Sequence, residues 1–468
     1  MCILGEALYA GMKEDGMLHT NNIIRLVYIC ISTALVAGCG QGVHAPLANP
    51  AIKSFTATPA IVSPGQPTTL SLDFTGGTGK IVSFGNNTTV SRTTTFGNAT
   101  TIRPKVDTMY TLTVTNKAGV KVSQSVVVKL STIQSRFSSS IGHTVDTRDN
   151  STATLLPSGK VLLAGGGSGT PLPFRKSAEL YDPATSTFAA TGFMKYSSAS
   201  HTATLLNNGQ VLFTGGWDGL KSHSEAQLYD PTLGSFAFTT GPMGRARSLH
   251  TATLLPGGMV LITGGYDGAV TLASAELYDF VTGTFTFTNG PMAVARSGHT
   301  ATLLNNGKVL IAGGTPDDTR CELYDPVSGT FTFTKGHMTY QRSFHTATLL
   351  SSDPNAKVLI AGGTSGPNAE LYDPVTDTFG ATNPMTAART YHTATLLPDS
   401  RVLLAGGSDE TAELYDPDTR SFAETLRTMK EARGSHTATL LPNVTGPVPG
   451  IVLLVGGTGL KNRADLFR

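Results

Sequence analysis

The sequence predicts an all-β protein in which a small β-sandwich precedes a seven-bladed β-propeller. The first observation is a six-residue block that occurs seven times between Ser151 and the C-terminus, at intervals of 44 to 50 residues. The second is that each interval holds short segments of strand type separated by turn residues. The third is a separate stretch of alternating strands nearer the N-terminus. An interval of this length fits one four-stranded propeller blade.

The repeated block reads His-Thr-Ala-Thr-Leu-Leu, and the segments after it follow a constant order. A turn such as Asn208-Gly209 leads to an apolar strand that ends in a glycine pair, then a third strand of the type Ala-Glu-Leu-Tyr-Asp-Pro, then a fourth that starts at a phenylalanine. Copies of the block begin at Ser151, His201, His250, His299, His345, His392 and His436. Because a four-stranded blade is too thin to bury a core alone, its neighbours must supply the missing apolar contact.

The last repeat ends at Arg468 without a fourth strand. Phe137 lies 14 residues before Ser151, and the other fourth-strand phenylalanines lie 13 or 14 residues before the next block. An incomplete last blade would leave an unpaired edge, which folded β-proteins avoid. We therefore predict that a strand near residues 136–140 completes the last blade and closes a ring of seven.

The glycine pair, the Tyr-Asp-Pro turn, the aromatic fourth strand and the arginine before the block resemble the kelch repeat. The resemblance covers roughly residues 137–468, and it departs from the family where phenylalanine replaces the usual tryptophan. It implies a kelch-type propeller over residues 132–468, similar to the central domain of galactose oxidase.

Residues 51–131 predict the β-sandwich. The expected strands are Ala51–Thr58, Thr68–Thr75, Lys80–Phe84, Tyr110–Thr115 and Val120–Leu130. Their spacing and alternation are typical of a sandwich. The last strands resemble those of bacterial immunoglobulin-like domains, which implies an immunoglobulin-like β-sandwich. We interpret it as a spacer, with an adhesive or carbohydrate-binding module as the alternative.

The N-terminus predicts export. The apolar segment from Leu26 to Ala37 has 12 residues, too few to span a bilayer, and it fits the core of a signal peptide. The segment ends in Val-Ala-Gly-Cys39, which resembles the lipobox of bacterial lipoproteins. The resemblance implies a signal peptide over residues 1–38, lipidation of Cys39, a linker over residues 39–50, and an anchor in the outer membrane or at the cell surface of a bacterium. A plain secretory signal is the alternative, and Met1 and Met17 both remain possible starts.

Composition excludes some functions. The chain has 34 Lys and Arg against 32 Asp and Glu and no run of like charge, which argues against nucleic-acid binding. Four cysteines, two of them in or before the signal segment, give no disulfide framework. We expect a monomer.

Charged residues recur in the repeats as matched sets. In the one repeat that has Ser198 instead of arginine before the block, the acid of the third strand is also replaced, by Gln227. Since losing one partner would strand a buried charge, this joint loss predicts ion pairs within blades. The pairs are Arg148–Glu179, Arg247–Glu276, Arg296–Glu322, Arg342–Glu370, Arg389–Glu413 and Arg433–Asp465. The alternative is a ring of arginines that faces the channel and binds acidic ligands, as in some kelch adaptor proteins.

We expect no cofactor, with copper as the alternative. The segment Arg389-Thr390-Tyr391-His392 resembles the one that supplies a tyrosine and a histidine to copper in galactose oxidase, so the resemblance implies Tyr391 and His392 as ligands. Three observations oppose copper. The same histidine recurs in five other repeats, and the family takes a further histidine from a C-terminal domain, whereas this sequence ends at Arg468. The family also needs a cysteine cross-linked to a second tyrosine, whereas Cys321 stands where the other repeats have alanine, which is typical of a core position.

The loops after the glycine pairs differ most between repeats, and they contain the only tryptophan. Exposed aromatic residues beside charges suit recognition of a partner. We therefore predict no catalytic residue, but a surface-anchored binding or scaffold lipoprotein that recognises a protein or carbohydrate on this face. The alternative function is a copper-radical oxidase of primary alcohols or sugars, like galactose oxidase. The expected binding residues are Phe174, Arg175, Trp217, His223, Tyr266, Asp267, Asp317 and Asp318.

Overall fold

The computed structural model describes residues 49–58, 61–62, 68–75, 77–84, 92–94, 100–102, 108–130, 137–167, 174–316, 318–407, 409–442, 450–458 and 462–468. These residues contain strands and turns and no helix, which confirms the predicted all-β class. The described chain divides into two compact units, and the main boundary between them lies at Leu130. Cys39 and the signal segment lie outside the described residues. Within the described part, no helix meets the length and apolarity needed to cross a bilayer.

The first unit has two sheets. One has the order β1-β3-β6, and the other has the order β2-β8-β7-β4-β5. Their strands are β1 (Ala51–Thr58), β2 (Ile61–Val62), β3 (Thr68–Thr75), β4 (Thr78–Phe84), β5 (Arg92–Thr94), β6 (Thr100–Ile102), β7 (Thr108–Thr115) and β8 (Lys121–Leu130). The ring of Phe74 in the first sheet lies against Gly79 and Leu112 of the second, so the core forms between the two sheets.

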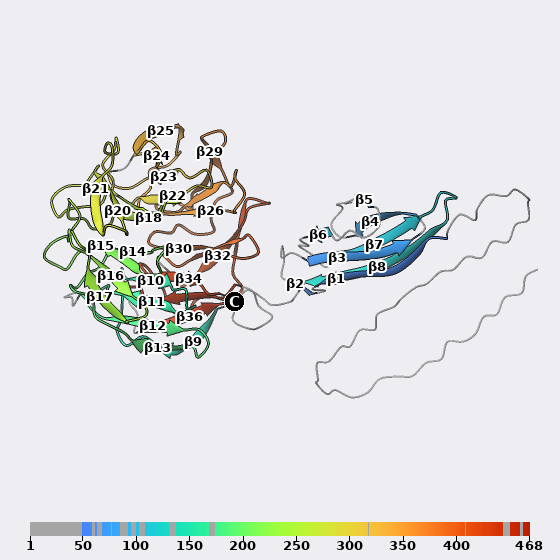
Figure 1. The fold of residues 1–468 in the computed structure, drawn as a ribbon, viewed down its shortest axis with the longest axis horizontal. Helices are drawn as coiled ribbons and strands as arrows, with labels where there is room; N and C mark the ends of the chain where they lie inside the picture. The colour runs from blue at the N-terminus through green and yellow to red at the C-terminus, as the bar shows by residue number, and fades with distance from the viewer. Residues whose placement is uncertain are drawn as a thin grey trace, which may run out of the picture. The chain divides into compact units, whose positions relative to one another are not determined.

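The second unit consists of seven four-stranded antiparallel sheets, which we call blades 1 to 7 (Figure 1). Blades 1 and 2 are β10 (Thr152–Leu155), β11 (Val161–Ala164), β12 (Ala178–Asp182), β13 (Thr187–Ala190) and β14 (Thr202–Leu205), β15 (Val211–Thr214), β16 (Ala226–Asp230), β17 (Ser235–Phe238). Blades 3 and 4 are β18 (Thr251–Leu254), β19 (Val260–Thr263), β20 (Ala275–Asp279), β21 (Thr284–Phe287) and β22 (Thr300–Leu303), β23 (Val309–Ala312), β24 (Arg320–Asp325), β25 (Thr330–His337).

Blades 5 and 6 are β26 (Thr346–Leu349), β27 (Val358–Ala361), β28 (Ala369–Asp373), β29 (Thr378–Ala381) and β30 (Thr393–Leu396), β31 (Val402–Ala405), β32 (Ala412–Asp416), β33 (Ser421–Glu424). Blade 7 is β34 (Thr437–Leu440), β35 (Val452–Val455), β36 (Arg463–Phe467) and β9 (Phe137–His143). The first strands of successive blades contact one another, and β10 of blade 1 contacts β34 of blade 7, so the ring is closed. Figure 1 shows these first strands toward the centre of the ring.

The strand predicted near residues 136–140 is β9, which pairs with β36 at the edge of blade 7. Phe137 is the register partner of Phe467, and their ring centroids lie 5.1 Å apart. Blade 7 is therefore built from both ends of the propeller sequence, and its outer edge is paired like those of the other blades.

The core of the propeller lies between blades. Every residue of the second strands is buried, because a blade packs on each side of them. One cluster joins Leu162 and Ala178 of blade 1 to Val211 and Phe213 of blade 2, and corresponding clusters follow around the ring. This arrangement explains why the third strands repeat Ala-Glu-Leu-Tyr: alternate side chains face the two neighbouring blades.

Candidate functional site

All six predicted ion pairs lie within single blades. The nitrogen–oxygen distance is 2.8 Å for Arg148–Glu179, 2.6 Å for Arg247–Glu276, 3.3 Å for Arg296–Glu322, 2.9 Å for Arg342–Glu370, 2.6 Å for Arg389–Glu413 and 2.9 Å for Arg433–Asp465. These side chains are almost fully buried, so they do not form a cationic ring open to solvent. Each guanidinium also donates to the carbonyl oxygen of the first glycine of its pair, such as Gly264 in blade 3. The pairs therefore hold blades together internally and offer no ligand site.

Blade 2 replaces this pair with neutral groups. The hydroxyl of Ser198 donates to the carbonyl oxygen of Gly215 at 3.0 Å, and the phenol of Tyr196 donates to that of Glu225 at 2.7 Å. Gln227 accepts a hydrogen bond from the backbone N–H of Lys195 at 2.8 Å. The exception is thus a second way to satisfy the same backbone groups, and it leaves Nε2 of Gln227 without a hydrogen-bond partner among the described residues. Sequence reasoning found Ser198 and Gln227 but missed Tyr196, which lies two positions away from the repeated arginine.

The aromatic residues of the variable loops pack against the next blade. The ring of Phe174 in blade 1 lies on Gly219 of blade 2, and the indole of Trp217 approaches Gly268 of blade 3. Trp217 is also held by backbone pairing with Ala199. These rings therefore fill the gaps between successive loops, and neither is the freely exposed anchor that the sequence predicts.

The charged and polar residues predicted on the same face also have structural partners. Arg175 pairs with Asp146 at 3.2 Å, and the phenol of Tyr266 donates to the carbonyl oxygen of Gly268. The remaining residues accept or share hydrogen bonds inside their own loops: Asp267 with Ala269 and Val270, Asp318 with Arg320, and His223 with Glu225. Asp317 lies outside the described residues. The structure does not bring these side chains together in one site.

The axis of the propeller carries a feature that sequence reasoning missed. The residue directly before each repeated block donates its backbone N–H to the carbonyl oxygen of its counterpart in the preceding blade, and Asn150 of blade 1 donates to Ser435 of blade 7 at 3.0 Å. Seven such bonds close a ring through Asn150, Ser200, Leu249, Gly298, Phe344, Tyr391 and Ser435. All seven residues have positive φ angles, between 48° and 63°. Only Gly298 adopts this conformation without steric cost.

These seven residues, which we call the axial ring, line a cavity of about 300 Å³ together with the six repeated histidines. Their side chains are asymmetric: Leu249, Phe344 and Tyr391 are apolar or aromatic, whereas the others are small or polar. The rings of Phe344 and Tyr391 are stacked, with centroids 4.2 Å apart, and the Phe344 ring also lies against Gly298. The signal in the sequence was the variability of the position directly before an otherwise uniform block.

The repeated histidines join neighbouring blades. Nε2 of His392 in blade 6 hydrogen-bonds Oγ1 of Thr346 in blade 5 at 2.9 Å, and equivalent histidine–threonine bonds occur at the five other histidines. Burial, and then the nearby Arg389, lower the pKa of His392 to about 3. His392 is therefore neutral at physiological pH. Desolvation raises the pKa of the Tyr391 phenol, so that group is a proton donor there.

The residues around Tyr391 and His392 do not fit the copper that the galactose oxidase resemblance implies. Nε2 of His392 is engaged by Thr346, and Cys321 is buried in a core cluster between blades 4 and 5. Among the described residues, no group of three or more His, Cys, Asp or Glu side chains can hold a metal ion. Copper binds to nitrogen, sulfur or phenolate donors that converge on one point, and a ring of blade-joining histidines does not converge.

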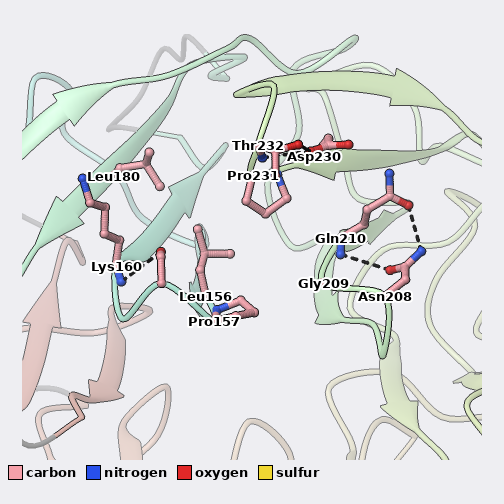
Figure 2. Close-up of a pocket in the computed structure, with 11 residues that line it drawn as sticks. Leu156, Pro157, Lys160, Leu180, Asn208, Gly209, Gln210, Asp230, Pro231 and Thr232 are labelled. Atoms are coloured by element: carbon pink, nitrogen blue, oxygen red, sulfur yellow. Dashed lines mark hydrogen bonds between the residues drawn. The ribbon is translucent and has the colours of Figure 1, made fainter.

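A second cavity, of about 720 Å³, lies between blades 1 and 2 (Figure 2). Its polar residues have turn partners: Lys160 pairs with Asp182 at 3.1 Å, Asn208 bonds Gln210, and Asp230 caps its own turn at Thr232. The pairs Lys308–Asp325 and Lys357–Asp373 repeat the Lys160 contact in other blades. Because these contacts belong to the general repeat, this cavity has no specialised chemistry.

Comparisons with known proteins agree with the fold. No protein-family model and no curated protein matches the chain. Among solved structures, the chain is similar to a fungal alcohol oxidase of the AA5 family in complex with copper, with a TM-score of 0.57 and 16% identity. The match covers 71% of this chain and 76% of that chain.

Our prediction of a non-enzymatic binding or scaffold protein is contradicted by this neighbour, which is an alcohol oxidase. The physical reason lies in the loops, where Phe174, Trp217 and their charged neighbours make contacts within the propeller. The chain shares the all-β propeller fold of a copper alcohol oxidase, while its described residues lack that metal's donor set.

Proposed function

We propose that the axial cavity is the substrate site of an oxidase that acts on primary alcohols or sugars. The observation that carries the proposal is the position of Tyr391. Tyr391 as a residue is 42% exposed and belongs to the axial ring, and its side chain stacks on Phe344. It precedes His392 as the tyrosine does in the resembling segment of galactose oxidase. The structural neighbour is an alcohol oxidase, which supports the same substrate class.

The lining of the cavity suits such a molecule. Leu249, Phe344 and Tyr391 offer an apolar surface for the C–H face of a sugar or for an alkyl chain. The hydroxyls of Ser200 and Ser435 lie on the remaining part of the ring and can bond substrate hydroxyls. A small number of polar groups beside an aromatic wall is the usual composition of a small-molecule site.

The overall reaction would convert the primary alcohol to an aldehyde while dioxygen accepts two electrons and two protons and becomes hydrogen peroxide. The described residues do not fit copper, so they bind and orient the alcohol in this proposal and carry no redox step. The experiment therefore measures metal content and oxidation separately. The purified full chain, with and without added Cu(II), is incubated with galactose, glycerol and benzyl alcohol, and hydrogen peroxide release and bound copper are measured. We expect peroxide from at least one of these alcohols.

Variants locate the activity. Tyr391→Ala removes the exposed wall of the cavity, and we expect kcat/KM to fall by at least about tenfold, which corresponds to one aromatic contact of about 1.4 kcal/mol. Phe193→Ala removes an aromatic side chain that is exposed elsewhere and should leave the rate unchanged. Absence of peroxide from every alcohol in both metal conditions would refute the proposal, and equal activity of Tyr391→Ala would remove the axial cavity from it.

From the sequence we further propose that Cys39 carries a lipid, that the protein is a bacterial outer-membrane or cell-surface lipoprotein, and that the sandwich is an immunoglobulin-like spacer. The Val-Ala-Gly-Cys39 segment supports the lipid anchor. Cys39→Ala should move the expressed protein from the detergent phase into the soluble exported fraction. Retention in the detergent phase would place the anchor elsewhere.

A further inference from the structure

His201, His250 and His299 each contact the preceding blade, in the consecutive pairs of blades 1 and 2, 2 and 3, and 3 and 4. We call the contact between two neighbouring blades a seam. Nε2 of His250 in blade 3 lies 3.2 Å from Oγ1 of Thr202 and 2.9 Å from Oγ1 of Thr214, both in blade 2. His299 of blade 4 makes the same two contacts with Thr251 and Thr263 of blade 3, at 3.1 and 3.0 Å. Nε2 of His250 and Nε2 of His299 thus each contact two threonine hydroxyls of the preceding blade.

His201 completes the set at the seam between blades 1 and 2. Its Nε2 lies 3.0 Å from Oγ1 of Thr152, and Ala164 stands where the other two seams have a second threonine. All three side chains are buried, and Nδ1 of each has no hydrogen-bond partner among the described residues. Protonation of His250 or His299 would therefore place a charge and a second N–H donor in a site without an acceptor for it, whereas the backbone of Ser198 offers His201 one.

The charged groups that face these histidines are cations and other imidazoles. Arg148 faces His201, Arg247 faces His250 and His299, and the histidines also face one another along the ring. Arg296 faces His299 as well. The nearby carboxylates are committed to those arginines: Glu179 to Arg148, Glu276 to Arg247 and Glu322 to Arg296. A proton added to a histidine meets like charge and no free acid.

We infer that these three histidines make the propeller acid-labile: they hold blades 1 to 4 together while they are neutral, and the seams open on mild acidification. The seam between blades 7 and 1 is a natural contrast, because Ser151 replaces the histidine there. His345 and His436 make the corresponding contacts with Thr300 and Thr393 and also have an Nδ1 without a partner among the described residues, so the same acid sensitivity is expected at their seams and is not confined to one arc.

The direction in which stability changes with pH follows from proton binding. Burial lowers the pKa of His201 to about 4 and of His299 to about 3, and it lowers the pKa of His250 well below its usual range. Between about pH 6.5 and these values, the unfolded chain binds protons that the folded chain does not, so stability is lost as pH falls. Each histidine lowers the folding equilibrium constant by up to about tenfold per pH unit in this window, and three lower it by up to about a thousandfold.

The experiment measures urea unfolding of the full chain at half-unit steps from pH 7.5 to pH 5. The variants His250→Gln and His299→Gln keep a hydrogen-bonding side chain but do not titrate. We expect each to flatten the pH dependence by up to about tenfold per pH unit, and the double variant to flatten it by up to about a hundredfold. Hydrogen exchange at pH 5.5 should increase in β10, β14, β18 and β22, the first strands of blades 1 to 4, and the two glutamine substitutions should reduce that increase in β14, β18 and β22.

Ser151→His is the opposite variant, and it stays informative if the glutamine variants unfold. It adds an imidazole at the seam that lacks one, opposite Thr437, so the loss of stability with acid should become steeper. Stability at neutral pH alone does not decide the matter, since any repacking changes it. An unchanged pH slope in the double glutamine variant, or in Ser151→His, would overturn the inference.

Discussion

Blades 2 and 3 occupy adjacent places in the ring and differ in the group buried between their second and third strands. In blade 3, Arg247 donates to the carbonyl oxygens of Gly264 and Ser274 and pairs with Glu276. In blade 2, the hydroxyls of Tyr196 and Ser198 donate to the equivalent carbonyls. What the repeat requires is therefore a donor for two fixed carbonyl oxygens, and a charge is only one way to supply it.

The acidic residue of the third strand follows the same rule. Oε2 of Glu276 accepts the backbone N–H of Gly244 at 2.6 Å, and the amide oxygen of Gln227 accepts that of Lys195 at 2.8 Å. The acceptor for the loop between blades is thus retained when the charge is lost. Burial lowers the pKa of Arg247 while Glu276 opposes that change, whereas the phenol of Tyr196 has no such need for a counter-charge.

Removing one partner of the ion pair in blade 3 should have the largest effect on stability. Arg247→Ala leaves the buried carboxylate of Glu276 without its counter-ion, and we expect the free energy of unfolding to fall by about 3–5 kcal/mol. Urea unfolding followed by far-UV circular dichroism measures it. Adding Glu276→Gln should recover part of the loss. A loss below about 1 kcal/mol for the single variant would mean that water reaches the ion pair.

Introducing a charge into the neutral blade is the next test. Ser198→Arg places a guanidinium in a slot occupied by Tyr196 and facing neutral Gln227, so we expect a loss of about 2–3 kcal/mol from unpaired burial. The double variant with Gln227→Glu supplies the counter-ion and should be more stable than the single variant. If both variants unfold at the same urea concentration, the slot in blade 2 is open to water.

Removing one hydroxyl should cost less. Tyr196→Phe keeps the ring stacked on His223, whose centroid lies 4.1 Å away, but leaves the carbonyl oxygen of Glu225 without this donor. We expect a loss of about 1–2 kcal/mol in urea unfolding. Tyr340→Phe, at the equivalent position of blade 5 where the arginine is present, is the matched control and should change stability by less than about 0.5 kcal/mol. Equal losses in the two variants would contradict the role assigned to the phenol.

The repeat explains why the exceptional blade and the closing strand could be predicted from the sequence. Ser198 and Gln227 identified the exceptional blade because a shared period places equivalent residues in equivalent environments, and Phe137 identified the closing strand by the same spacing. Tyr196 was not predictable, since its side chain reaches the carbonyls from two positions before the one that arginine occupies in the other repeats. A substitution by a residue at another position leaves no trace in a column-by-column comparison.

The candidate site was less predictable for a related reason. Trp217 and Phe174 belong to variable loops, and variability suggested a partner, yet their partners are glycines of the next loop. The variable position that lines a cavity is the single residue before the block, exemplified by Tyr391, where one-residue differences are easily overlooked. Which variable residues face an open space depends on the ring closing through backbone bonds, and no local pattern encodes that closure.

The smallest change in stability is expected for a variant that gives blade 3 the neutral residues of blade 2, and it tests most strictly whether these residues can replace the ion pair. The triple variant Arg245→Tyr, Arg247→Ser and Glu276→Gln gives blade 3 the three residues found in blade 2. Gly264 and Ser274 keep donors, Gly244 keeps an acceptor, and no charge is left buried.

Replacing a complete buried ion pair with a well-packed neutral set is often close to neutral in stability. We therefore expect the triple variant to unfold within about 1 kcal/mol of the parent, although it contains a change at Arg247, whose alanine substitution alone should cost several times more. The same urea measurement compares the two, with Arg247→Ser alone as the control. A triple variant as unstable as that control would show that the carbonyls of blade 3 require a guanidinium, and that the neutral solution depends on features found only in blade 2, such as the ring of His223 beneath Tyr196.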